Sequence, residues 1–142
     1  MKRQMTNPTD AQIEALLRQS KTIAVVGLSP DPTRPSNGIA RYLQRSGYRV
    51  IPVNPNATEV LGEKCYPSLR HIPEPVDIVN VFRRPEFLDA FAAGAIAMHA
   101  KALWMQQGIA NPEAAVRVTE AGLLAIQDRC IMIEHMRLVG AS

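Results

Sequence analysis

The residues best suited to chemistry lie in one stretch, TIAVVGLSPDPTRPSNG, at residues 22–38. The β-branched apolar run Ile23–Val26 predicts a strand that stops at Gly27, and a proline-rich loop leads to Ser36-Asn37-Gly38, which we expect to cap a helix. Unpaired N–H groups at a helix N-terminus attract anions, and glycine lets a ligand approach the backbone. The stretch therefore predicts a phosphate-binding loop with Gly27 and Ser29 as contacts. The alternative is that Gly27 only closes a turn.

Polar residues also stand at the ends of the other apolar runs that predict strands, at residues 48–53, 76–82, 102–106 and 123–126. Because the carboxyl ends of parallel strands meet at one edge of a sheet, we expect these residues to line a ligand-binding crevice. The residues at these strand ends are Asn54, Arg83, Gln106 and Asp128, and Ser29 of the first loop joins them. Arg83 and Arg84 are adjacent on extended chain, so at most one of them faces the crevice.

The segments between these strands indicate an α/β fold. Apolar residues at helical spacing predict helices at 10–19, 36–47, 85–99, 111–118 and 131–139. The turn-rich segment 57–75 predicts a loop with one short helical turn. Since strand–helix–strand crossovers are right-handed, we expect a Rossmann-like, doubly wound sheet of five parallel strands, with strand order 3-2-1-4-5 and helices on both faces. Residues 1–142 are expected to form a single domain, with a helix in residues 1–20 packed on it.

Several familiar motifs are missing from the sequence. Gly27-Leu28-Ser29-Pro30 lacks the second and third glycines of GxGxxG, and Asn54 stands where a dinucleotide site would carry an acid. The chain has no P-loop, no G-x-S-x-G elbow and no His pair at metal-ligand spacing. Cys130 precedes the last predicted helix, a place that can lower a thiol pKa, although a buried inert thiol is the commoner case. These features predict a binding site without a catalytic constellation.

Composition narrows the range of partners. The net charge of +3 and the pI near 9.1 come from scattered basic residues without interleaved aromatics, a pattern that favours an anionic small molecule over nucleic acid. No run of about 18 apolar residues suggests a membrane span, and no apolar h-region follows the basic start. Cys65 and Cys130 lie far apart without metal spacing, so we expect a cytoplasmic protein with reduced cysteines.

Six motifs in order resemble the small stand-alone CoA-binding proteins of bacteria, which are similar to the N-terminal CoA-binding domain of the succinyl-CoA synthetase α subunit. The motifs are VVGLS at 25–29, SNGIARYLQRSGYRVIPVNP at 36–55, Gly62 with Cys65-Tyr66-Pro67, VDIVNVFRRP at 76–85, LWMQQGI at 103–109 and DRCIMIEH at 128–135. The resemblance implies a Rossmann-like fold and coenzyme A as ligand. It also implies ligand contacts, which are Gly27, Leu28, Ser29, Asn54, Pro55, Phe82, Arg83, Trp104, Met105 and Gln106.

The same resemblance shapes the expected function. The ligase's basic residue after the second strand has no clear match in Pro55-Asn56-Ala57, and Arg34 of the first loop is our substitute, although it could equally be a solvated arginine. The ligase's catalytic domain is absent, so we expect non-covalent binding of CoA or an acyl-CoA and no enzyme activity. The alternatives are an acyl-CoA or thiol-handling enzyme that uses Cys130, and an NAD-type nucleotide sensor that acts through an unknown partner protein.

Overall fold

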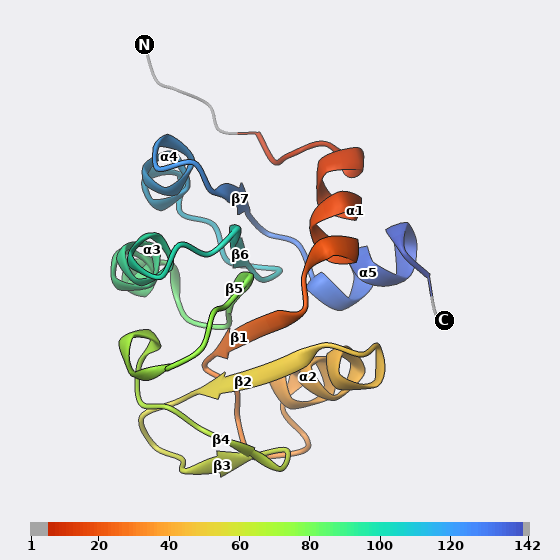
Figure 1. Ribbon diagram of the computed structural model, residues 1–142, viewed down its shortest axis with the longest axis vertical. Helices are drawn as coiled ribbons and strands as arrows, with labels where there is room; N and C mark the ends of the chain where they lie inside the picture. Colours follow the sequence, from red (N-terminus) through yellow and green to blue (C-terminus); the bar gives the residue numbers. More distant parts are fainter. Residues whose placement is uncertain (1–5, 141–142) are drawn as a thin grey trace.

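The protein is built around a sheet of five parallel strands, seen in a computed structural model that describes residues 6–140 (Figure 1). The sheet has the order β2-β1-β5-β6-β7. Its strands are β1 (Thr22–Val26), β2 (Arg49–Val53), β5 (Ile78–Val81), β6 (Ala102–Met105) and β7 (Leu124–Ile126). The strands are runs of apolar residues because both faces of the sheet are covered, so alternate side chains enter two separate cores.

Helices cover both faces, as expected. One face carries α1 (Asp10–Gln19), α2 (Pro35–Arg45) and α5 (Ile131–Leu138), which stand to the right of the sheet in Figure 1. The other face carries α3 (Leu88–Ala97), α4 (Pro112–Glu120) and the 3₁₀ turn η1 (Leu69–His71). A second 3₁₀ turn, η2 (Pro85–Phe87), precedes α3. The prediction of a Rossmann-like α/β fold with five parallel strands is confirmed.

The position of the third sheet strand differs from the expected order. Counted along the chain the strands lie in the order 2-1-3-4-5, with β5 beside β1, whereas 3-2-1-4-5 would put β5 outside β2. The reason lies in the connection between β2 and β5, whose turn η1 packs Leu69 against Gly94 of α3, on the face opposite α2. A right-handed crossover on that face runs the other way across the sheet and carries β5 past β1.

The helix starts follow local rules, with one correction. Thr9 caps α1 in a reciprocal capping box with Gln12, and the Asn111 side chain accepts the Ala114 N–H at the start of α4. The expected cap of the second helix, Ser36-Asn37-Gly38, is wrong because α2 starts at Pro35 with Arg34 as its N-cap.

The loop expected over residues 57–75 contains the predicted helical turn, η1, and also a small hairpin. Its strands β3 (Glu59–Val60) and β4 (Glu63–Lys64) are antiparallel and joined by Leu61 and Gly62, whose φ angles are 54° and 76°. Two positive φ angles in a two-residue turn are typical of type I′, but leucine is a poor signal for one. The sequence therefore did not predict the hairpin.

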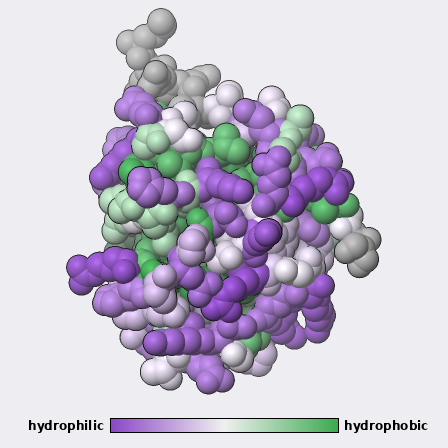
Figure 2. Space-filling model, in the orientation of Figure 1, coloured by the Kyte–Doolittle hydropathy of each residue, from purple (hydrophilic) through white to green (hydrophobic). Residues whose placement is uncertain are grey.

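No helix within residues 6–140 is long and apolar enough to cross a membrane. Figure 2 shows a face of the molecule that is largely hydrophilic, with hydrophobic patches between the polar side chains.

Candidate functional site

The strand order places a topological switch point between β1 and β5, because β2 lies on one side of β1 and all later strands of the sheet lie on the other. In doubly wound folds the carboxyl edge at this point is where ligands bind. Gly27 leaves β1 at this edge with φ 84°, and its N–H donates to the Val53 carbonyl at 2.8 Å. A Cβ at Gly27 would come within 3.0 Å of the Phe82 carbonyl oxygen and 3.2 Å of Arg83 Cδ. The loops after β1 and β5 therefore touch, and only glycine fits between them.

The loop between β1 and α2 is held in place by the first turn of the helix. The Ser29 N–H donates to the Ser36 hydroxyl at 3.1 Å, and Asn37 Nδ2 donates to the Ser29 carbonyl at 2.9 Å. The Ser29 hydroxyl accepts the Asp31 N–H at 3.1 Å. Ser36 and Asn37, expected to cap the helix, instead fix the shape of the loop that reaches the switch point.

The end of β2 is tied to the same loop. Asn54 Nδ2 donates to the Leu28 carbonyl at 3.0 Å, while its Oδ1 accepts the Asn56 N–H at 2.9 Å. The Asn54 side chain thus has partners for both its donor and its acceptor, and Pro55 beside it is exposed. Leu28 is fully buried and its carbonyl is taken by Asn54, so it supports the loop from inside and is not accessible to a ligand in this structure. The structure brings residues 27–29 and 54–55 together, as the sequence predicts.

Three arginines stand at this edge and differ in their surroundings. Arg34 is exposed at the N-cap of α2, next to the single acidic side chain of residues 27–38, Asp31. Arg83 is half-buried, with its guanidinium 4.5 Å from the centre of the Phe87 ring. Arg84 is exposed, so Arg83 is the member of this pair that lies against Gly27.

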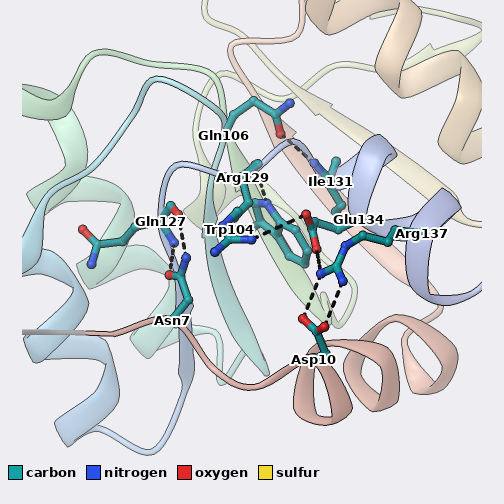
Figure 3. Close-up of polar contacts among 9 residues, drawn as sticks. All are labelled: Asn7, Asp10, Trp104, Gln106, Gln127, Arg129, Ile131, Glu134 and Arg137. Carbon is teal, nitrogen blue, oxygen red and sulfur yellow. Dashed lines mark hydrogen bonds and ion pairs between the residues drawn. The ribbon is translucent and has the colours of Figure 1, made fainter.

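The two hydrophobic members of the predicted contacts at the end of β6 lie inside the protein. Trp104 is 0% exposed in the core beneath α2 and α5, and its Nε1 donates to the Arg129 carbonyl at 2.8 Å (Figure 3). Met105 is buried in the opposite core, beneath α3 and α4. Neither side chain is accessible to a ligand in this structure. Both instead fix the strand whose end stands at the switch point.

Gln106 connects the end of β6 to the start of α5. Its Oε1 accepts the Ile131 N–H at 3.2 Å (Figure 3). The same oxygen accepts Asn80 Nδ2 at 3.3 Å, and both contacts are buried. Asn80 stands in the middle of β5, is 0% exposed, and has no hydrogen-bond partner for its Oδ1. We did not predict a role for it, although an amide within the apolar run VDIVNVF was a visible signal.

Cys130, for which the sequence left a reactive role open, and His135 are both buried, Cys130 at the N-cap of α5 and His135 within it. Cys130 is 7% exposed and packs in the core that holds Trp104. His135 Nδ1 lies 2.7 Å from the Tyr42 hydroxyl, and burial, followed by the charge of Arg18, lowers the pKa of His135. The contact between His135 and Tyr42 joins α5 to α2. Within residues 6–140 no group of three or more His, Cys, Asp or Glu side chains could hold a metal ion.

The N-terminal segment is attached to the last turn of α5 through charged groups and to the loop after β7 through an amide (Figure 3). Arg137 pairs with Asp10 at 2.8 Å and with the buried Glu134. Asn7 exchanges two hydrogen bonds with the Gln127 backbone, at 2.7 and 2.9 Å. These contacts hold α1 against α5 and leave the carboxyl edge of β1 and β2 to the loops described above.

Two proteins resemble this chain over most of its length, and a third resembles it over less than half. The chain is 46% identical over 131 residues to the Bacillus subtilis protein YneT, which covers 92% of this chain and 97% of that protein. A solved structure of a Pyrococcus horikoshii protein superposes with a TM-score of 0.91 at 42% identity, covering 99% of this chain and all of the other. A shorter match, 42% identical over 63 residues, is to the ADP-forming acetate–CoA ligase II of Archaeoglobus fulgidus and spans 43% of this chain and 9% of the ligase.

The profile of a family described as "CoA binding domain" matches residues 21–136, which include every strand of the main sheet and all but the last residues of α5. This match covers most of the chain, and it runs through the switch point and both loops that meet there. The chain therefore belongs to the CoA-binding domain family.

Proposed function

We propose that the protein binds coenzyme A or an acyl-CoA non-covalently and has no catalytic activity of its own. The observation that carries this proposal is the close approach at Gly27, where the loops after β1 and β5 meet beside the start of α2. Family membership supplies the ligand class. The first turn of α2 has no acidic residue, so nothing on the helix itself offsets the anion-attracting end of its dipole.

In this proposal the pyrophosphate of CoA lies over the loop of residues 27–29, where the N-terminal end of α2 attracts it and Arg34 and Arg83 supply positive charge. The Gly27 and Ser29 N–H groups, already bonded to Val53 and Ser36, hold the loop in shape. The adenosine extends towards Asn54-Pro55 and Phe82, because the nucleoside of a doubly wound site lies across the ends of the strands beside the switch point. The Asn54 amide is already bonded to Leu28 and Asn56, so its role is to shape this edge. Trp104, Met105 and Gln106 support the site from below.

The proposed absence of catalytic activity rests on the burial of two reactive side chains, Cys130 and His135. The Cys130 thiol is buried in a core, and His135 is buried between α2 and α5 with the Tyr42 hydroxyl on its ring. A nucleophile or general base must reach the reacting atoms of its substrate, and neither group is exposed at the edge of the sheet. Arginines and backbone amides bind anions but do not transfer acyl groups.

The test is calorimetric titration of the reduced protein with CoA, with dephospho-CoA, NAD and ADP as comparison ligands. We expect CoA to bind at micromolar strength and more tightly than NAD. Arg83→Ala is the informative variant and Arg84→Ala its matched control, since both remove one positive charge from adjacent positions. We expect the Arg83 variant to weaken CoA binding about tenfold or more, as for loss of one charge-assisted contact, and the Arg84 variant to bind almost normally.

Two results would contradict this proposal. If CoA fails to bind at millimolar concentration, coenzyme binding is wrong for this chain. If NAD binds more tightly than CoA, the edge serves a different dinucleotide. Turnover of an acyl-CoA by the purified protein would refute the absence of catalysis, and loss of that turnover in Cys130→Ser would assign it to the thiol.

A further inference from the structure

One stripe of α2 carries arginines that form no ion pair within the described part of the chain. Arg34, Gly38, Arg41 and Arg45 follow one another at spacings of four, three and four residues, so they share one face of the helix. None of the three arginines forms an ion pair with any group in residues 6–140. Such a stripe is suited to an anion, and the question is which of the three side chains is placed to bind one.

Arg41 differs from its neighbours on the stripe. It is half-buried, whereas Arg34 and Arg45 are exposed, and its Nε is enclosed without a hydrogen-bond partner. Its Nη2 lies 3.7 Å from the position that a Cβ on Gly38 would occupy, so the side chain runs back towards the N-terminus of α2. A buried donor without an acceptor is costly, which points to a partner that this side chain acquires on binding.

A second buried group without a partner stands one turn earlier. Asn37 is 2% exposed, and its Nδ2 donates to the Ser29 carbonyl, but its Oδ1 has no hydrogen-bond partner. Asn37 and Arg41 are four residues apart and so adjoin on the surface of the helix. A cationic donor that lacks an acceptor therefore lies beside an acceptor that lacks a donor.

Arg41 and Asn37 lie on the flank of α2 that faces the segment after β2. Gln44, on the same flank of α2, donates through Nε2 to the Leu61 carbonyl at 3.2 Å, so this flank faces the β3–β4 hairpin that follows β2 (Figure 1). In doubly wound nucleotide sites the ribose lies at the end of the second strand, and a ribose phosphate is bound by a nearby arginine. A 3′-phosphorylated ribose offers phosphate oxygens as acceptors and a neighbouring 2′-hydroxyl as donor, which matches what Arg41 and Asn37 lack.

We propose that Arg41, beside Asn37, binds the ribose 3′-phosphate and makes the site selective for CoA over dephospho-CoA. This inference rests on the proposed function, since it assigns one part of the same ligand. It also moves the phosphate contact from Arg34, the substitute that we expected from the sequence, to a side chain that is better enclosed. Arg34 then remains with the pyrophosphate at the helix start.

The experiment compares Arg41→Gln with Arg45→Gln, which removes the same charge one turn further along the same stripe. Each variant and the unmodified protein are titrated with CoA and with dephospho-CoA. We expect Arg41→Gln to weaken CoA binding roughly 10- to 100-fold, the range for one charge-assisted contact, and to leave dephospho-CoA affinity within about twofold. Retained dephospho-CoA binding also shows that the variant is folded. Arg45→Gln should keep the preference for CoA.

The remaining outcomes separate this inference from the proposed function. If the unmodified protein binds CoA and dephospho-CoA equally, or if Arg41→Gln keeps the preference for CoA, the assignment to Arg41 is wrong while coenzyme binding stands. Equal losses for both ligands in Arg41→Gln would likewise overturn the assignment, because the residue would then be structural. If the unmodified protein binds neither ligand, the proposed function fails and this subsite fails with it.

Discussion

Replacing Gly27 with alanine tests the feature on which the site depends. Gly27 has φ 84°, which costs an L-residue about 1–2 kcal/mol, and a Cβ there would meet the Phe82 carbonyl oxygen at 3.0 Å and Arg83 Cδ at 3.2 Å. The oxygen belongs to the backbone at the end of β5 and cannot move cheaply. Forcing an extra methyl into such a place adds about 1–3 kcal/mol, and reduced entropy of the unfolded chain returns about 0.4–1 kcal/mol. We therefore expect Gly27→Ala to lower the free energy of unfolding by about 1–4.5 kcal/mol.

Gly47→Ala is the matched control. Gly47 has φ 98° in the turn between α2 and β2, but nothing lies within 4 Å of its missing Cβ. Its replacement therefore carries the backbone cost alone, a net loss of about 0–1.5 kcal/mol, which is about 1–3 kcal/mol less than at Gly27. Urea unfolding at constant m-value measures both losses, and titration measures CoA binding. Gly27→Ala should also abolish or strongly weaken CoA binding, while Gly47→Ala should leave it unchanged. Equal destabilisation by the two substitutions would refute the close approach of the loops after β1 and β5.

Two further predictions concern pH. Burial alone would raise the pKa of Asp77, but the N–H groups of Lys21 and Thr22, bonded to its carboxylate, together with the Lys101 ammonium outweigh burial and lower the pKa below its usual 3.8. The stability that the Asp77 carboxylate contributes is present above pH 3.8 and is lost as pH falls through the folded-state pKa. Asp77→Asn should therefore lower the free energy of unfolding by about 1–2 kcal/mol at pH 7. It should also flatten the decline of that free energy below about pH 4. Burial lowers the pKa of His135 below 6.5, so the unfolded chain takes up this proton first and stability falls as pH drops below 6.5. His135→Gln should remove that slope in urea unfolding, and a slope that survives the substitution would show that another group causes it.

The strands and most helices could be predicted because their signals are local. Uninterrupted apolar runs identify strands buried on both faces, and the Thr9 and Asn111 caps mark the starts of α1 and α4. The position of β5 was not local information. It depends on which face the β2–β5 connection crosses, and that is decided by the contact between Leu69 and Gly94, 25 residues apart in sequence. The start of α2 was a misread signal, because Pro35 at the first helical position outweighed the polar residues after it.

The candidate site could be predicted at the level of strand ends but not of side-chain roles. Position in the chain identifies a residue that follows a strand, yet it does not show whether the side chain points into a core, as Trp104 does, or bonds a neighbouring loop, as Asn54 does. The role proposed for Arg41 could not be predicted from the sequence for the opposite reason. Arg41 stands in a helix and shares its face with exposed arginines, so only the enclosure of its Nε distinguishes it.

The arrangement of partners at the carboxyl edge indicates how the ligand is recognised. The short polar side chains there, Ser36, Asn54 and Gln106, are already bonded to backbone groups of the loops and of α5. What remains for a ligand is chiefly the arginine side chains, which are donors, beside one unpartnered acceptor, Asn37 Oδ1. Arginine donors bind acceptors, and phosphate groups are the strongest acceptors that a coenzyme offers. Selectivity among anionic ligands must then come from the spacing of the cations, and for this reason Arg41 and Arg83, which the fold holds in place, matter more than the exposed Arg34.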